Sequence, residues 1–411
     1  MSSRTSRTTA VALAVVLGLG AAPAAVADTA PAAGPTVYGL DSKGYSDVTG
    51  INNSGVVVGY AYPQSWEVQS TAMRWDTANI TTTAGTSIPG TALAPLPGDR
   101  FDEAMGVNEA GTVIGISWPS PTDCGCSAQQ KHAVRWAADG KPTALAPLPG
   151  DAYGRPVAVN AGGTAVGYTL SDAGQEHAVA WQPDGTPVAL KPLPGDVRSV
   201  PSAVNSSGMA VGYSQGAAFD SPKHAIVWGP DGTATALDPA GDYVVSTASR
   251  INDAGTVLGQ ASPDGEASRG VVWDADGNPR ELGVGRWGTA LNAAGVVVGG
   301  EPDPVHSGGH AVRFDPDGTS TPLGGPLADY ESSVAVAVNS AGAAVGYSFY
   351  GGPSRGNQAA LSWTPGGAVT NLRPGDFAAA SLVNDAGLVA GVLISHNEIH
   401  FALHSAAVWK P

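Results

Sequence analysis

The chain has 411 residues, among them 56 glycines and 32 prolines, and only 13% of its residues are charged. So little charge and so many turn formers exclude a coiled coil, and an apolar fraction of 43% excludes global disorder. The net charge of −15 disfavours nucleic acid and acidic membrane surfaces as partners, because both carry phosphate groups that the chain would repel.

The amino-terminal segment has the pattern of a secretory signal. Arg4 and Arg7 give it a basic start, a short apolar stretch follows, and residues 25–27 form a small-residue cleavage site. We therefore predict a signal peptide over residues 1–27, a linker over residues 28–35, and a secreted, extracellular mature protein. No other stretch is long enough (about 18 apolar residues) to cross a membrane, so no membrane insertion is predicted.

One internal repeat then runs through the rest of the chain. Each copy has an asparagine, a glycine three residues later and a second glycine four residues after that. The eight asparagines, numbered here as copies one to eight, are Asn52, Asn108, Asn160, Asn205, Asn252, Asn292, Asn339 and Asn384. The Asn-x-x-Gly segment predicts a tight hairpin in which the glycine has a left-handed backbone. The second glycine, inside an apolar strand, predicts a close approach of two backbones.

Two more strands follow in each copy. The third ends on an aromatic residue, and a tight turn such as Pro183-Asp184-Gly185 leads to a fourth that carries a leucine. Four short strands per copy predict an all-β fold, a β-propeller of eight four-stranded blades in one domain over residues 36–411. Residues 36–41 resemble an orphan fourth strand, so we expect the amino-terminal strand to complete the last blade. A different blade count and a β-solenoid remain as alternatives.

These motifs resemble the extracellular HAF repeat family, whose members carry G-I-N-x-x-G-x-V-V-G followed by H-A-F-x-W. The best matches are residues 203–213 and 224–228, and the resemblance covers the whole mature chain. The histidine occurs in only four copies, and aliphatic residues replace the phenylalanine. The resemblance implies an exported repeat protein and supplies no catalytic residues.

The two cysteines, Cys124 and Cys126, are separated by one glycine. In an exported protein we predict that they form a local disulfide. A reactive pair and a metal site are the alternatives, but two thiols do not complete a zinc shell.

Several motifs suggest chemistry that their context does not favour. Residues 212–216 match the G-x-S-x-G nucleophile elbow and residues 283–288 match G-x-G-x-x-G, but neither precedes a helix. Asp274 and Asp276 hint at a calcium loop without enough oxygen ligands. The remaining candidate set is a group of histidines at metal-ligand spacing, His396, His400 and His404, which would lie too far apart in a strand. We predict no catalytic residues, no metal and no cofactor.

An aspartate ends the link between copies at several places: Asp99, Asp151, Asp196, Asp242, Asp376 and the less regular Asp329. Turn formation explains these residues, and the alternative is a ring of carboxylates that would attract a cation or a sugar.

Alternation of strands places the uniform turns on one face and the variable loops on the other. We expect binding on the variable-loop face, which carries the candidate ligand-binding aromatics Trp66, Trp118, Phe219, Phe349, Tyr350 and Phe401. The predicted function is a monomeric, non-catalytic scaffold that binds an extracellular glycan or protein. The alternative is a carbohydrate-active enzyme with acids at the propeller mouth.

Overall fold

Every regular element in the described part of the chain is a β-strand. In this computed structural model, the described part is residues 35–410 except 43, 63–69, 79, 81–86, 120–129, 219, 240, 242, 264–266, 304–308, 325–331, 350–357, 374–376 and 397–401. The predicted signal peptide therefore lies outside it. No helix in these ranges is long and apolar enough to span a membrane.

The strands follow the repeat, with four in each of copies one to seven and three in copy eight, and β1 (Thr36–Asp41) lies ahead of the first copy. Copies one to four contain β2 (Tyr45–Ile51), β3 (Val56–Tyr62), β4 (Thr71–Asp76), β5 (Ser87–Ala92); β6 (Phe101–Val107), β7 (Val113–Trp118), β8 (His132–Trp136), β9 (Pro142–Ala144); β10 (Asp151–Val159), β11 (Ala165–Ser171), β12 (Glu176–Trp181), β13 (Pro187–Ala189); β14 (Arg198–Val204), β15 (Ala210–Gln215), β16 (Lys223–Trp228), β17 (Ala234–Ala236). Copies five to eight contain β18 (Tyr243–Ile251), β19 (Val257–Pro263), β20 (Arg269–Trp273), β21 (Pro279–Val284); β22 (Trp287–Leu291), β23 (Val297–Pro302), β24 (Gly309–Phe314), β25 (Ser320–Pro322); β26 (Ser332–Val338), β27 (Ala344–Phe349), β28 (Gln358–Trp363), β29 (Val369–Asn371); β30 (Ala378–Val383), β31 (Val389–His396), β32 (Ala402–Lys410).

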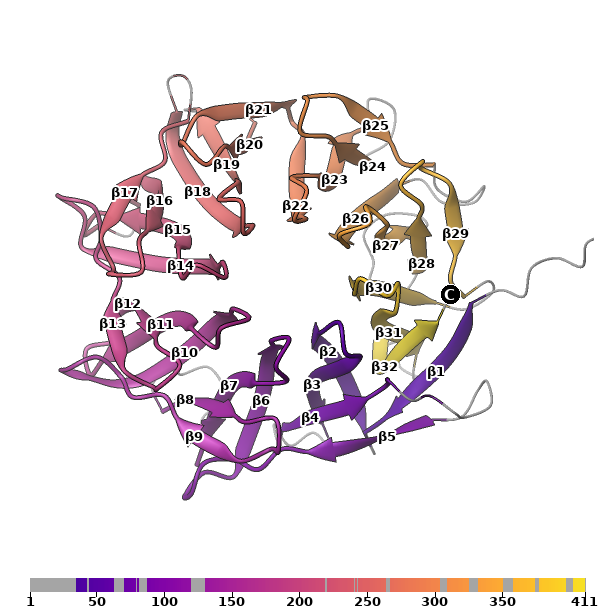
Figure 1. Ribbon diagram of the computed structural model, residues 1–411, viewed down its shortest axis with the longest axis horizontal. Helices are drawn as coiled ribbons and strands as arrows, with labels where there is room; N and C mark the ends of the chain where they lie inside the picture. Colours follow the sequence, from indigo (N-terminus) through magenta and orange to yellow (C-terminus); the bar gives the residue numbers. More distant parts are fainter. Residues whose placement is uncertain are drawn as a thin grey trace, which may run out of the picture. The chain divides into compact units, whose positions relative to one another are not determined.

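Copies two to seven each form a four-stranded antiparallel sheet in chain order. The sheets lie around a common axis, with the first strand of each copy innermost (Figure 1). Copies one and eight belong to one sheet of order β2-β3-β4-β5-β1-β32-β31-β30, in which β1 pairs antiparallel with β32 and parallel with β5. The prediction of an all-β propeller is confirmed at this level.

The Asn-x-x-Gly hairpins have the predicted local structure. The glycine of each copy has φ between +78° and +88°, in the left-handed region that favours glycine. The asparagine side chain closes the same turn, since its Oδ1 accepts the backbone N–H four residues later, as in Asn52 and Val56 at 2.9 Å. The asparagine Oδ1 is thus satisfied within its own hairpin.

The second glycine marks a bulge in the strand beside it. At Gly59 a Cβ atom would lie 1.9 Å from the carbonyl oxygen of Asp47, and the equivalent distance is 2.0–2.1 Å in the other seven copies. Next to that contact the first strand carries an extra residue, as between Val48 and Gly50. The predicted close approach of two backbones is confirmed, and no residue with a side chain fits there.

The eight asparagines also bond to one another. The Nδ2 of each donates to the backbone oxygen of the next, from Asn52 to Asn108 at 3.0 Å and onward to Asn339 and Asn384. Asn384 returns the series to Asn52 at 3.1 Å. All eight side chains are buried, so these bonds replace bonds to water and join neighbouring sheets.

The core consists of apolar layers between neighbouring sheets. The aromatic residue of each third strand is buried between sheets, and seven of the eight are tryptophans with at most 1% of their surface exposed. Five of these indoles donate to a carbonyl oxygen just after the fourth-strand leucine of the preceding copy, as Trp181 does to Ala146 at 2.7 Å, and Trp75 donates in the same way to Asp41 at the end of β1. These bonds hold the link between copies against the next sheet.

Candidate functional site

The two candidate aromatics that the structure describes pack against their own sheets. Trp118 is the last residue of β7 with 7% of its surface exposed, and its ring centroid lies 5.9 Å from that of Phe101. The Lys131 ammonium covers it at 4.7 Å. Phe349, half-buried at the end of β27, lies edge-on to Tyr347. Trp118 is therefore not the exposed loop residue that the sequence suggested.

The other sequence candidates lie outside the described residues. These are the aromatics Trp66, Phe219, Tyr350 and Phe401, the predicted disulfide pair Cys124 and Cys126, and the histidine His400. Of the proposed histidine set, His404 is described, and its Nδ1 lies 3.6 Å from a carboxylate oxygen of Asp47. Among the described residues no group of three histidines, cysteines or acids could hold a metal ion.

The link aspartates of copies two, three and four each bind a hydroxyl and an imidazole. The hydroxyl oxygen lies 2.5–2.6 Å and the histidine Nδ1 2.8–3.0 Å from the carboxylate. The carboxylate side chains are 2–10% exposed and the imidazoles 38–49%. The three sets are Asp99, Ser117 and His132; Asp151, Thr169 and His177; Asp196, Ser214 and His224.

These sets are structural ties and not catalytic triads. In a triad the imidazole lies between the nucleophile and the acid and takes the nucleophile's proton. Here the hydroxyl and the imidazole both bind the carboxylate, so the imidazole does not lie between them to take the hydroxyl's proton. Ser214 of the apparent nucleophile elbow is buried within β15 in this arrangement. The three aspartates therefore join a link to two strands and do not form an exposed ring of carboxylates.

One buried carboxyl group departs from its repeat. In several copies, the backbone N–H of a third-strand alanine donates to a serine hydroxyl in the first strand of the next copy. The serines are Ser46, Ser246 and Ser333. In copy two the acceptor is instead the carboxyl group of Asp102, 2.9 Å from the backbone nitrogen of Ala72. Asp102 is 2% exposed and its Oδ2 has no hydrogen-bond partner. Burial raises the pKa of Asp102 to about 7.

Two grooves open on the face formed by the tight turns, opposite the variable-loop face on which the sequence predicted binding. Each lies at a seam, where the turns of one copy meet the hairpin of the next. The groove between copies five and six has a volume of about 390 Å³, and the groove between copies eight and one about 400 Å³. Both volumes fall in the range of ligand sites.

Apolar and charged groups line the first groove together. Val272, Pro279 and Pro316 give it apolar walls, and Asp274 and Arg280 add opposite charges. Hydrogen bonds from Asn278, first from its side chain and then from its backbone, hold the pKa of Asp274 below its usual range. This carboxylate is therefore ionised over the physiological range and available to a cation.

The second groove has a different charge at the same position. Lys410 directly follows Trp409, as Asp274 directly follows Trp273, and it lines the second groove. Small residues of the hairpins, Ala386 here and Ala254 in the first groove, leave space at equivalent points. The sequence did not indicate either groove, because the valine that precedes the third-strand aromatic at both of them also occurs in copy four, as Val227.

The comparisons with known proteins concern the fold. No protein-family model matches the chain, and no curated protein sequence does. Among solved structures, dipeptidyl peptidase 4 of Porphyromonas gingivalis is similar with a TM-score of 0.57 and 11% identity, over 89% of this chain and 58% of that one. A puromycin hydrolase S511A mutant complexed with PGG has a TM-score of 0.51 and 14% identity, over 88% and 58%. The β-propeller domain of the Trilobed protease from Pyrococcus furiosus has a TM-score of 0.47 and 9% identity, over 76% and 94%.

These likenesses correct the function predicted from the sequence. The similar structures named here are peptidases and a hydrolase, which contradicts the prediction of a non-catalytic, carbohydrate-binding scaffold. The chain spans 58% of the length of the two structures with the higher scores. At 11% and 14% identity the similarity shows the fold alone.

Proposed function

We propose that this chain is a peptide-binding β-propeller of the kind found in peptidases. The observation that carries the proposal is the pair of grooves at equivalent seams of the turn face, each of about 400 Å³. The peptidases with a similar fold give the class of ligand, because they act on peptides.

The groove walls suit an extended peptide. Alanine and glycine at the hairpins, such as Ala254, Ala294 and Gly295, let a second backbone approach closely. Apolar surface from Pro279 and Pro316 accepts side chains, and opposite charges nearby match a chain that carries both amino and carboxyl groups. A sugar would instead require stacked aromatic faces, and neither groove has an aromatic lining residue among the described residues.

The test is binding of unstructured peptides to the full chain, measured by fluorescence anisotropy with a labelled random decapeptide pool. Ala254→Trp and Ala386→Trp fill one groove each from exposed hairpin positions, and the double variant should lose most of the binding. Ala161→Trp serves as the control. This exposed residue lies in the hairpin of copy three, one residue before the position equivalent to Ala254, and away from both grooves. Absence of binding by the wild type, or full binding by the double variant, would overturn the proposal.

We also propose that the propeller has eight blades and that the amino-terminal strand closes it. Two observations support this count: the series of asparagine bonds passes through eight copies and returns to its start, and β1 pairs with β32 in the last copy. Removal of residues 36–41 from the mature chain should then expose the edge of β32 and lower the melting temperature markedly.

The resemblance to HAF repeats and the pattern of residues 1–27 support a further part of the proposal, that the protein is exported. Expression with the native amino terminus should release a chain that begins near residue 28 into the medium. A product that remains in the cytoplasm with residues 1–27 attached would contradict it.

A further inference from the structure

Three seams are filled by an arginine of the chain itself. Each arginine directly precedes the third-strand aromatic of its copy and reaches the next copy's turns. The clearest is Arg135, which donates to the carbonyl oxygens of Pro183 at 2.7 Å, Gly163 at 2.9 Å and Gln182 at 3.2 Å. The carbonyls of one hairpin and one turn thus form a site for a guanidinium group.

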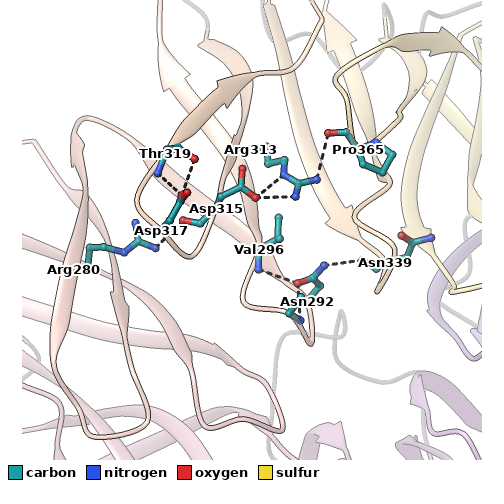
Figure 2. A network of polar contacts seen from close by, with 10 residues as sticks. Arg280, Asn292, Val296, Arg313, Asp315, Asp317, Thr319, Asn339 and Pro365 are labelled. Atoms are coloured by element: carbon teal, nitrogen blue, oxygen red, sulfur yellow. Dashed lines mark hydrogen bonds and ion pairs between the residues drawn. The ribbon is translucent and has the colours of Figure 1, made fainter.

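The other two arginines follow the same rule. Arg74 donates to the hairpin carbonyl of Gly111 at 3.1 Å. Arg313 donates to Pro365, which is equivalent to Pro183, at 3.4 Å. Its guanidinium also binds Oδ1 of Asp315, the residue just after β24, through Nε at 3.0 Å and a terminal nitrogen at 2.8 Å (Figure 2). In copy six an arginine and the aspartate two positions later therefore form one unit.

Copy five keeps the aspartate of this unit and lacks the arginine. Val272 stands where copy six has Arg313, and Asp274 stands where it has Asp315. The groove of about 390 Å³ lies at this place, and Asp274, Gly295 and Pro316 line it. Gly295 and Pro316 are equivalent to Gly163 and Pro183, whose carbonyl oxygens accept from Arg135.

Arg280 is a resident cation of this groove, and it occupies the acceptor equivalent to Gln182 of the Arg135 site, which leaves the carbonyl oxygens of Gly295 and Pro316. It lies on the wall, and one terminal nitrogen donates to the carbonyl oxygen of Asp315 at 3.4 Å (Figure 2). Among the described residues no arginine reaches the carbonyl oxygens of Gly295 or Pro316. The Asp274 carboxylate faces the groove with Oδ2 bonded once, to the Asn278 side chain at 2.9 Å, so this oxygen still has acceptor capacity.

The groove between copies eight and one differs in the features that matter. Its hairpin carbonyl, that of Gly55, already accepts the backbone N–H and the hydroxyl of Thr77. Lys410 takes the place of Asp274 and would repel a cation. The second groove therefore has a similar size but no carboxylate among the described residues of its lining, whereas the first has Asp274 beside Arg280, and it serves as an internal reference.

We propose that the groove between copies five and six binds the arginine side chain of a peptide, with the guanidinium held by Asp274 and the carbonyl oxygens of Gly295 and Pro316. The inference rests on the proposed function and adds the residue that the site selects. The acidic character of the chain, with a net charge of −15, favours the approach of such a cationic segment.

The experiment compares two short labelled peptides that differ only by arginine or citrulline, titrated against the full chain. Citrulline keeps the shape and removes the charge, and we expect it to weaken binding at least tenfold. Asp274→Asn should weaken the arginine peptide about fivefold or more. Asp276→Asn, which removes the same charge from the same turn but lies outside the groove lining, should leave the affinity unchanged.

Val272→Arg supplies the missing guanidinium from within and should abolish the preference for arginine. Because Val272 is 6% exposed, this variant is interpreted only if its circular dichroism matches that of the wild type, and Asp274→Asn tests the proposal without it. Equal affinity for the arginine and citrulline peptides, or for wild type and Asp274→Asn, would overturn the inference while the proposed function stands. If no peptide of either kind or from the random pool binds, the proposed function itself fails.

Discussion

The Nδ2 of Asn384 donates a 3.1 Å hydrogen bond to the backbone oxygen of Asn52, which precedes it by 332 residues. The other seven asparagine bonds join positions only 40 to 56 residues apart. The long-range bond therefore ties the last copy to the first with the same contact that joins every other pair. Each asparagine performs two tasks, closing its own hairpin through Oδ1 and holding the next sheet through Nδ2.

Asn205→Asp separates these two tasks. The carboxylate keeps the acceptor for the Met209 N–H but places an oxygen opposite the backbone oxygen of Asn252, where the amide now donates at 3.2 Å. Since the site is 3% exposed, we expect a loss of about 1–3 kcal/mol in the free energy of unfolding, measured by urea denaturation. Ser206→Ala, in the same hairpin as Asn205, removes an exposed hydrogen bond to Asp253 of the next copy and should lower the free energy of unfolding much less. Equal losses for the two variants would contradict a special role for the ring.

Gly167→Ala tests the close approach of two backbones. Its Cβ would lie 2.1 Å from the carbonyl oxygen of Arg155, and backbone must move to admit it. We expect a loss of about 3 kcal/mol, at the upper end of overpacking, seen as a lower melting temperature. Gly162→Ala is the matched control, because its Cβ would meet only the Asn160 side chain at 3.5 Å. A wild-type melting temperature for Gly167→Ala would show that the strands can separate at no cost.

The local parts of the repeat could be predicted because they depend on residues close in sequence. The hairpin needs only Asn52 and Gly55, and the bulge needs a glycine opposite it. The asparagine ring could not be predicted in this way, since each donor meets an acceptor in another sheet. The copy count came from the repeat itself, whereas the packing of one sheet on the next is set by tryptophans such as Trp181 that bond to the preceding link.

The candidate site was harder to predict for a physical reason. Aromatic residues at strand ends, such as Trp118, pack on their neighbours as readily as they face solvent, and sequence does not distinguish the two. Both grooves lie at seams where no arginine precedes the third-strand aromatic. Val272 is unremarkable alone and becomes informative only beside Arg135 and Arg313, once the contacts of those arginines are known.

Asp151→Ala tests whether the aspartate, hydroxyl and imidazole sets are structural ties. The change leaves the buried Thr169 hydroxyl and the His177 imidazole without their carboxylate acceptor. We expect a loss of about 1–3 kcal/mol in the free energy of unfolding, and Asp151→Asn should recover part of it by accepting from Thr169. Peptide binding at the turn face should be unchanged in both variants. A folded Asp151→Ala protein with wild-type stability would contradict the structural role.

Asp102→Ser replaces a buried carboxyl by the residue that copies one, five and seven have at this position. Because the pKa of Asp102 is about 7 in the folded chain and 3.8 is its ordinary value, the folded state holds the proton more tightly. The carboxyl therefore costs least stability below about pH 4, and the cost grows as the pH rises to about 7. We expect Asp102→Ser to stabilise the protein at pH 8 by on the order of 2 kcal/mol more than at pH 5, measured by urea denaturation. Ser246→Ala removes the equivalent acceptor without a titratable group, so its effect should be the same at both pH values. An equal effect of Asp102→Ser at pH 5 and pH 8 would mean that Asp102 does not titrate in this range.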